Sequence, residues 1–165
     1  MKQAFLLLFA FVFAPMASFA VTCPLGPKET TLTVQRVMLN FGRYYADFDD
    51  LAYKARNPNE TITDKDMQTA IDKLEVAIAC ADEVIKNPTV DTLPSKLSTI
   101  KDEAQRKDLI DSYLYFMEDF KEGLMECRQL VQAVLGQAPS ERNYSPFIEK
   151  SKEMNGRIDH AHSKL

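Results

Sequence analysis

Apolar residues recur at alternating steps of three and four along four segments of this chain, and this spacing leaves few possible folds. The most regular segment, 105–135, follows a heptad pattern typical of a helix packed against other helices. Its apolar positions are Tyr113, Met117, Phe120, Leu124, Cys127, Val131 and Val134. A half-buried strand would instead alternate at every second residue, so the sequence predicts an all-α protein.

Three other segments show the same spacing and stop at helix-breaking residues. We expect helices over 29–56, 64–87 and 140–163. Pro58 stops the first and Pro88 the second. Gly136, followed by Pro139, ends the segment 105–135. Because most connections are too short for crossovers, the predicted fold is an antiparallel up-down-up-down four-helix bundle.

The N-terminal capping residues leave alternatives open for two of these helices. Either Thr63 or Asp64 caps the second helix, because both side chains accept hydrogen bonds from free backbone N–H groups. We expect Ser140 to cap the fourth helix, with Glu141 in its first turn. Pro146 falls too deep for this start, so the fourth helix alternatively begins beside Pro146.

The first and fourth helices differ in how apolar their predicted inner faces are. The first has a broad stripe of Val34, Val37, Phe41, Tyr44, Phe48, Leu51 and Ala55, widened by Met38, Tyr45 and Ala52. The fourth has a sparse stripe of Tyr144, Ile148, Ser151, Asn155, Ile158, His162 and Leu165. Fewer large side chains on one wall of the bundle would leave room for a bound group.

The N-terminus has the pattern of a cleavable secretory signal. Lys2 is followed by an apolar run over 4–14, which is about half of the roughly 20 residues that a membrane-spanning helix needs. The sequence Ala-Ser-Phe-Ala then supplies small side chains before a cut at Val21. We therefore expect residues 1–20 to be removed and residues 21–165 to form one domain. The alternative is a retained membrane anchor.

The charge of the exported chain argues against several functions. Removal of the signal takes away one lysine and no acidic residue, so 19 basic and 24 acidic side chains leave a net charge of −5. We therefore expect no binding to nucleic acid or to an anionic membrane. We also expect no enzyme, because no nucleophile has a neighbouring base and pairs such as Asp49 and Asp50 are typical of solvated helix surface.

Three cysteines, Cys23, Cys80 and Cys127, allow at most one internal disulfide in an oxidising compartment. The chain has no Cys-x-x-Cys pair, which argues against a structural zinc site and against covalent attachment of haem. In the predicted bundle Cys23 and Cys80 lie toward one end and Cys127 toward the other. If a pair forms, we expect Cys23 with Cys80, which leaves Cys127 as a buried free thiol.

The chain has two histidines, and helical geometry separates them. His162 follows Ile158 by four residues and shares the predicted inner face, whereas His160 lies about 200° around the helix from Ile158 and faces water. Helix lengths place His162 level with about residue 34, within reach of Met38. A thioether and an imidazole that face each other can bind haem iron from both axial sides. The alternatives are a hydrogen-bonded core histidine and a methionine that fills the core.

The segment Met117 to Leu124, Met-Glu-Asp-Phe-Lys-Glu-Gly-Leu, resembles the Met-x-Asp-Phe-(basic)-x-Gly-(apolar) segment in the third helix of the soluble cytochrome b562 family. The signal ending, the four helical segments and a histidine near the C-terminus extend this resemblance. It implies that Met38 and His162 are axial ligands of iron, with Phe120 and Leu124 on the apolar wall against the porphyrin. The implied function is one-electron transfer in the periplasm by non-covalently bound haem b, with an unidentified redox partner protein.

A rival function needs no haem. The chain would then be a periplasmic helical binding protein, such as a stress chaperone or an immunity-type inhibitor of a secreted toxin. Its partner surface would be the acidic outer face or an aromatic cluster of Phe41, Tyr44, Tyr45 and Phe48. At this spacing, however, the aromatic residues are more typical of core.

Overall fold

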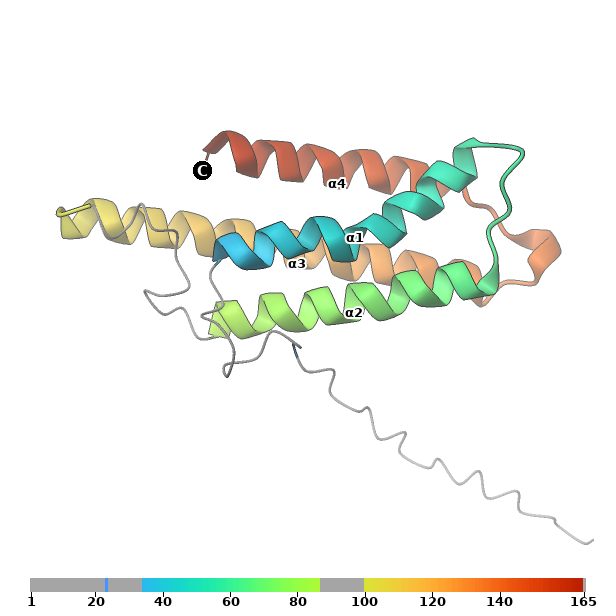
Figure 1. The fold of residues 1–165 in the computed structure, drawn as a ribbon, viewed down its shortest axis with the longest axis horizontal. Coiled ribbons are helices and arrows are strands. Elements are labelled where there is room, and N and C mark those ends of the chain that lie inside the picture. The colour runs from blue at the N-terminus through green and yellow to red at the C-terminus, as the bar shows by residue number, and fades with distance from the viewer. Residues whose placement is uncertain (1–22, 24–33, 87–99, 165) are drawn as a thin grey trace, which may run out of the picture.

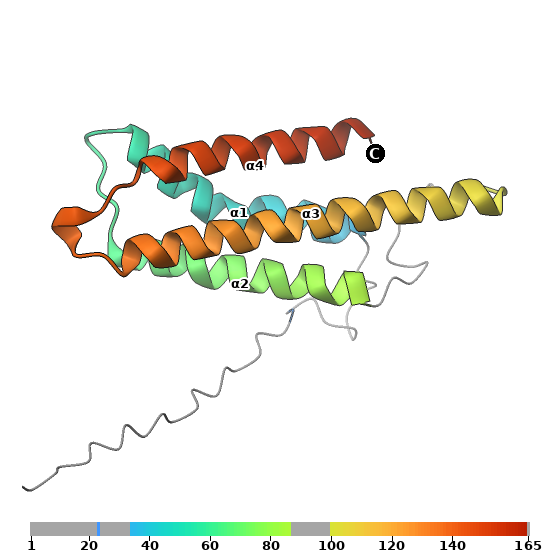
Figure 2. The same cartoon turned by 180° about the vertical axis from the view of Figure 1, so that it is seen from behind.

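The computed structural model describes Cys23 and residues 34–86 and 100–164, with backbone alone at 34–44 and 161–164. Four long helices lie side by side, and no described residue belongs to a strand (Figures 1 and 2). They are α1 (Val34–Arg56), α2 (Asp64–Lys86), α3 (Glu103–Leu135) and α4 (Ser145–Lys164), with a short 3₁₀ helix, η3 (Pro139–Glu141), before α4. The all-α prediction is therefore confirmed. The predicted signal, residues 1–20, lies outside the described residues.

Hydrogen bonds at the N-termini of α2 and α3 explain where these helices begin. Thr63 Oγ1 accepts from the backbone N–H of Asp66 at 3.2 Å, and the Asp66 carboxylate accepts from the Thr63 N–H at 2.9 Å. This reciprocal capping box makes Thr63, rather than Asp64, the N-cap. Before α3, the Asp102 carboxylate accepts from the N–H groups of Ala104 and Gln105.

The predicted capping role of Ser140 is wrong. Residues 139–141 form η3, and α4 begins at Ser145, whose N–H donates to Asn143 Oδ1 at 3.0 Å. Proline has no N–H and is tolerated in the first turn of a helix, where no intrahelical partner is needed. Helix α4 therefore begins beside Pro146, and this alternative prediction is confirmed.

The C-terminus of α3 is tied to α2 by an arginine that sequence analysis did not single out. Arg142 donates to the carbonyl oxygens of Leu135 and Gln137, each at 3.2 Å, and forms an ion pair with Asp64. Carbonyl groups at a helix C-terminus lack intrahelical partners, so the guanidinium stabilises the end of α3 while it holds the start of α2.

Most of the predicted core is confirmed. All seven apolar positions of the α3 heptad are buried. In α2, Met67, Ile71, Leu74, Ile78 and Ala81 are buried as well. The described part of α1 contributes Tyr45, Phe48, Leu51 and Ala52 to the same core.

The predicted inner face of α4 needs a correction. Phe147, Ser151 and Met154 are fully buried, whereas Asn155, which was predicted to face inward, is exposed. The helix is turned so that a phenylalanine and a methionine face the core, because burial of these large apolar side chains is favourable. In its described part, α4 is therefore a packed wall rather than a sparse one.

Contacts between helices define their register. Lys121 forms an ion pair with Asp82, and Arg128, two turns further along α3, lies 3.9 Å from Glu75. Residue numbers therefore rise along α3 where they fall along α2. The same holds between α3 and α4, where the contacting pairs are Asp119 with Arg157 and Glu126 with Lys150. It also holds between α1 and α4, where the contacting pairs are Tyr45 with Ser151 and Phe48 with Phe147.

The three cysteines are in two different states. Cys23 and Cys80 form a disulfide that spans 57 residues of sequence and joins the region before α1 to α2. Cys127 is a buried free thiol, and burial raises its pKa to about 12. A disulfide fits an oxidising compartment. None of the helices within 34–86 and 100–164 is long and apolar enough to cross a membrane.

Candidate functional site

The two predicted axial ligands belong to the start of α1 and the end of α4, which lie at the same end of the bundle. Met38 lies in the second turn of α1 and His162 in the last turn of α4. The first turn of α1 and the last turn of α4 are on the same side in Figure 1, and the reverse view in Figure 2 agrees. The side chains at both positions lie outside the described residues, so the ligand pair stays a prediction.

The register of α1 against α4 gives the levels of these two positions. Tyr45 contacts Ser151 across the seam. His162 is eleven residues beyond Ser151, and position 34 is eleven residues before Tyr45, so these two positions are level. Met38 is four residues further along α1, which is about 6 Å at the usual helical rise.

Phe120 and Leu124, the predicted apolar wall, belong to the buried stripe of α3. Leu124 has no exposed surface, and Phe120 retains 8%. Met117 and Tyr113 continue the same stripe toward the end of the bundle that contains the first turn of α1. The stripe is an apolar wall, and it is already covered by protein.

His160 was predicted to face water, and its side chain is exposed. Its ring also lies edge-on to Phe116 of α3, with ring centroids 6.0 Å apart. Phe116 in turn packs edge-on against the exposed Tyr115, at 5.9 Å. His160 therefore lies on the outer surface where α3 and α4 meet, outside the core.

A polar group in the α1–α4 seam was missed by sequence analysis. The Tyr45 hydroxyl donates to the carbonyl oxygen of Ser151 at 3.2 Å, and Ser151 Oγ donates to Asp49 Oδ1 at 2.5 Å. The description of Asp49 and Asp50 as solvated surface is thus wrong for Asp49, which is half-buried, and right for the exposed Asp50. The available signal was the spacing of Tyr45 and Asp49, four residues apart on one helix face.

Burial governs the ionisation of the tyrosine in this group. Desolvation raises the pKa of Tyr45 well above its usual value of 10.0, and the hydrogen bond to Ser151 opposes this effect only in part. The phenol therefore stays protonated at physiological pH and acts as a hydrogen-bond donor.

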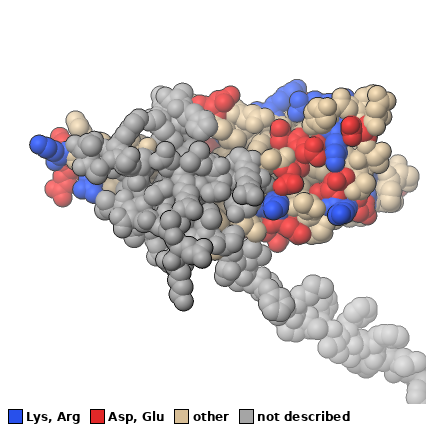
Figure 3. Space-filling model, in the orientation of Figure 1, with Lys and Arg blue, Asp and Glu red and all other residues tan. Residues whose placement is uncertain are grey.

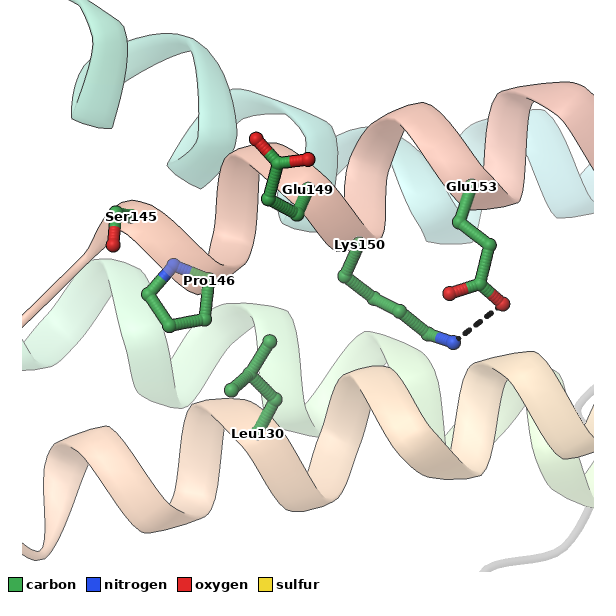
Figure 4. Close-up of a pocket in the computed structure, with 6 residues that line it drawn as sticks. All are labelled: Leu130, Ser145, Pro146, Glu149, Lys150 and Glu153. Atoms are coloured by element: carbon green, nitrogen blue, oxygen red, sulfur yellow. Dashed lines mark hydrogen bonds and ion pairs between the residues drawn. The ribbon is translucent and has the colours of Figure 1, made fainter.

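The α3–α4 flank is held by ion pairs rather than by an open charged site. Lys150 pairs with Glu126 and Glu153, and Arg157 pairs with Glu153 and Asp119. A shallow groove beside these pairs is shown in Figure 4. Its lining residues are Leu130, Ser145, Pro146, Glu149, Lys150 and Glu153. The ammonium group of Lys150 is held by carboxylates, so this groove offers no unpaired cation to an anionic ligand.

Other features of the described residues point to no second site. On the face shown in Figure 3, acidic and basic side chains are interspersed outside the grey region. No cluster of three or more His, Cys, Asp or Glu side chains suited to a metal ion occurs among the residues that the structure describes.

Comparison with family models, with curated proteins and with solved structures finds no match for this chain. The relation to the cytochrome b562 family therefore remains a resemblance carried by the segment Met117 to Leu124 and the features named with it.

Proposed function

We propose that the protein is an exported, periplasmic electron carrier that binds b-type haem non-covalently through Met38 and His162. In this proposal the bundle is antiparallel, up-down-up-down, and follows a signal peptide that is removed. The observation that carries the proposal is the register of α1 against α4, which puts the two positions at one end of the bundle and about 6 Å apart along its axis.

The chemistry of the donor set fits haem iron. A thioether and a neutral imidazole occupy the two axial positions of haem in electron carriers and favour the reduced iron. When bound, haem supplies a centre that gains and loses one electron. Met38 and His162 would hold the iron from opposite sides, which leaves no open position for a substrate. Electron transfer therefore suits these ligands better than catalysis.

The α3 stripe supports the same site from a third side. Tyr113, Met117 and Phe120 are buried on α3. The contact of Asp119 with Arg157 makes position 162 of α4 level with about residue 114 of α3, within this stripe. The role of the three buried residues in the proposal is to exclude water from the porphyrin faces. These three side chains, and Leu124 one turn deeper, are already covered by protein, so their packing must open if they are to touch haem.

The disulfide and the N-terminal pattern support the compartment. A link between Cys23 and Cys80 is stable where thiols are oxidised, and residues 1–20 have the form of a secretory signal. The periplasm satisfies both conditions. A redox partner protein in that compartment is implied, and its identity is open.

The test is haem binding by the mature chain, residues 21–165. We expect one haem per chain and sharp low-spin bands in the visible spectrum after reduction. His162→Ala and Met38→Ala should each lower haem affinity by roughly 100-fold or more, because even indirect partners of a metal site contribute 10–100-fold. His160→Ala is the matched control and should leave affinity unchanged.

The same experiment decides against the proposal in two ways. Absorbance of free haem alone, at all protein concentrations, would leave the haem-free binding protein as the better description. Equal loss of affinity in the His160→Ala and His162→Ala variants would mean that neither histidine is a specific ligand.

A further inference from the structure

The seam between α1 and α4 contains a buried polar group that the proposed haem site does not use. Ser151 is the single fully buried polar side chain in the described part of the core. Tyr45 and Asp49, one turn apart on α1, both contact it and form the two hydrogen bonds described above. We name these three residues the α1–α4 polar cluster.

The surroundings of the cluster are apolar. One turn away, the rings of Phe48 and Phe147 pack edge-on with centroids 5.8 Å apart, and both side chains are fully buried. Apolar surfaces tolerate small sliding movements because their attraction is not directional. Hydrogen bonds are directional, and a slide would leave the buried Ser151 hydroxyl and Tyr45 phenol without partners, which is strongly unfavourable.

Buried polar groups of this kind are best attested as devices that select one register of packed helices. The cluster is suited to that role because its two contacts run from one α4 residue to two α1 residues that are one turn apart. A displacement of one helical turn in either direction along the axis would break at least one of them. Apolar residues at the same places would fill the space without this selectivity.

We propose that Tyr45, Asp49 and Ser151 are positioning residues, which set the register of α1 against α4 and thereby the separation of positions 38 and 162. This inference rests on the proposed haem function for its purpose. A slip of one helical turn would move Met38 by about 5.4 Å relative to His162. Productive geometry at a ligand site tolerates about 0.5 Å, so such a slip would remove one ligand from the iron.

The register can be measured without haem. Met38→Cys with His162→Cys would introduce two thiols for spin labels, and the distance between the labels would be read by pulsed electron paramagnetic resonance. The native cysteines give little background, because Cys23 and Cys80 are joined and the buried Cys127 thiol has its pKa raised to about 12. The wild-type chain, which lacks the two introduced cysteines, is treated with the same label to measure this background.

We expect one narrow distance distribution when the cluster is intact. Adding Tyr45→Phe and Ser151→Ala to the labelled chain should broaden the distribution or shift it by about the rise of one turn. Asp49→Asn should preserve it, because the amide oxygen still accepts from Ser151 Oγ. Ile78→Val, a change in α2 that removes one buried methyl group, is the control for general loss of stability and should also preserve it. If Tyr45→Phe with Ser151→Ala does not fold, each single change serves in its place.

A second measurement, on unlabelled protein with haem, separates this inference from the proposed function. If the wild type binds haem in a low-spin state, the cluster variant should still bind haem but show a larger high-spin fraction, because one axial ligand is displaced. Asp49→Ala should also show a larger high-spin fraction, whereas Asp49→Asn should give the wild-type spectrum. If the wild type binds no haem, the proposed function fails, and the label distances alone decide the register. Unchanged label distances in the cluster variants would overturn the positioning role.

Discussion

Helices α2 and α3 pack differently from α4 against its neighbours. Between α2 and α3 the buried residues form a long, regular apolar stripe, with ion pairs such as Lys121 with Asp82 at its rim. Helix α4 is held by a buried serine in the α1 seam, by a close approach to a glycine of α3, and by ion pairs of Lys150 and Arg157 on its flank.

This difference shows that one set of contacts supplies most of the stability of the bundle and another set selects the register of its helices. Burial of large apolar side chains supplies most of the free energy of folding, but it selects a register only weakly. Directional contacts add little net stability and select one arrangement. If α1 and α4 carry the two ligands, directional contacts are needed in that seam rather than between α2 and α3.

The largest expected effect is in the α3 stripe. Leu124→Ala removes a fully buried side chain and should lower the free energy of unfolding by about 3 kcal/mol. Ser151→Ala, at an equally buried position of α4, should lower it by about 1 kcal/mol. Urea unfolding followed by circular dichroism measures both. An equal loss in the two variants would contradict the division between the two regions.

The next effect tests the close approach of α3 to α4. A Cβ at Gly123 would collide with Met154 Sδ and lie 3.0 Å from Met154 Cε. Met154 is fully buried, so its side chain has little room to turn away. Gly123→Ala should therefore destabilise the protein by about 1 kcal/mol, even though alanine favours helix.

Gly156 on α4 provides the matched control, because a Cβ there meets no atom within 4 Å. Gly156→Ala should raise the free energy of unfolding by up to about 1 kcal/mol. Combining Gly123→Ala with Met154→Ala should show a coupling between the two sites in thermal unfolding. Additive losses would mean that the helices do not approach closely at this point.

The sequence predicted the α2–α3 region well because each of its signals pointed one way. The heptad from Tyr113 to Val134 has an apolar residue at every expected position, and all seven are buried. The α2 helix has one apolar stripe between its capping box and Pro88, and the residues of this stripe are the buried ones.

The orientation of α4 could not be predicted in the same way. Two stripes were available, one through Ile148 and Asn155 and one through Phe147 and Met154, and both contain Ser151. The choice depends on the helix start, which Asn143 and Pro146 determine. A pattern of apolar residues does not contain this information.

The polar cluster was beyond sequence reasoning for a different reason. Tyr45 and Ser151 are separated by 106 residues, and their contact depends on the register of two helices that are not neighbours in sequence. The levels of positions 34 and 162 followed from helix lengths alone, because every residue of a helix has the same rise. Hydrogen bonds across the seam depend on rotation as well, which lengths do not give.

A smaller effect is expected at the capping box of α2, at one end of the α2–α3 region. Thr63→Ala should cost about 1 kcal/mol. The hydrogen bonds from Thr63 lower the pKa of Asp66 below its ordinary value of 3.8. The stability that this carboxylate contributes is thus present above pH 3.8 and lost as the pH falls through the lowered value. The difference between wild type and variant should therefore shrink in acid, down to the part that comes from the Thr63 Oγ1 hydrogen bond with the backbone N–H of Asp66. A difference in the free energy of unfolding that does not change with pH would contradict the carboxylate's share in the cap.

The smallest effect is expected on the α3–α4 flank, at Arg157. Its guanidinium donates to the carbonyl oxygen of Asp119 at 2.9 Å and pairs with Glu153, but about a quarter of the side chain is exposed, 23%. Solvent screens such pairs, so Arg157→Gln should cost about 0.5 kcal/mol at low salt and less at high salt. Urea unfolding at two salt concentrations measures this. A larger loss that salt does not change would show that Arg157 acts through its hydrogen bond to the α3 backbone, and the flank would then belong with the directional contacts that fix α4 rather than with solvated surface charge.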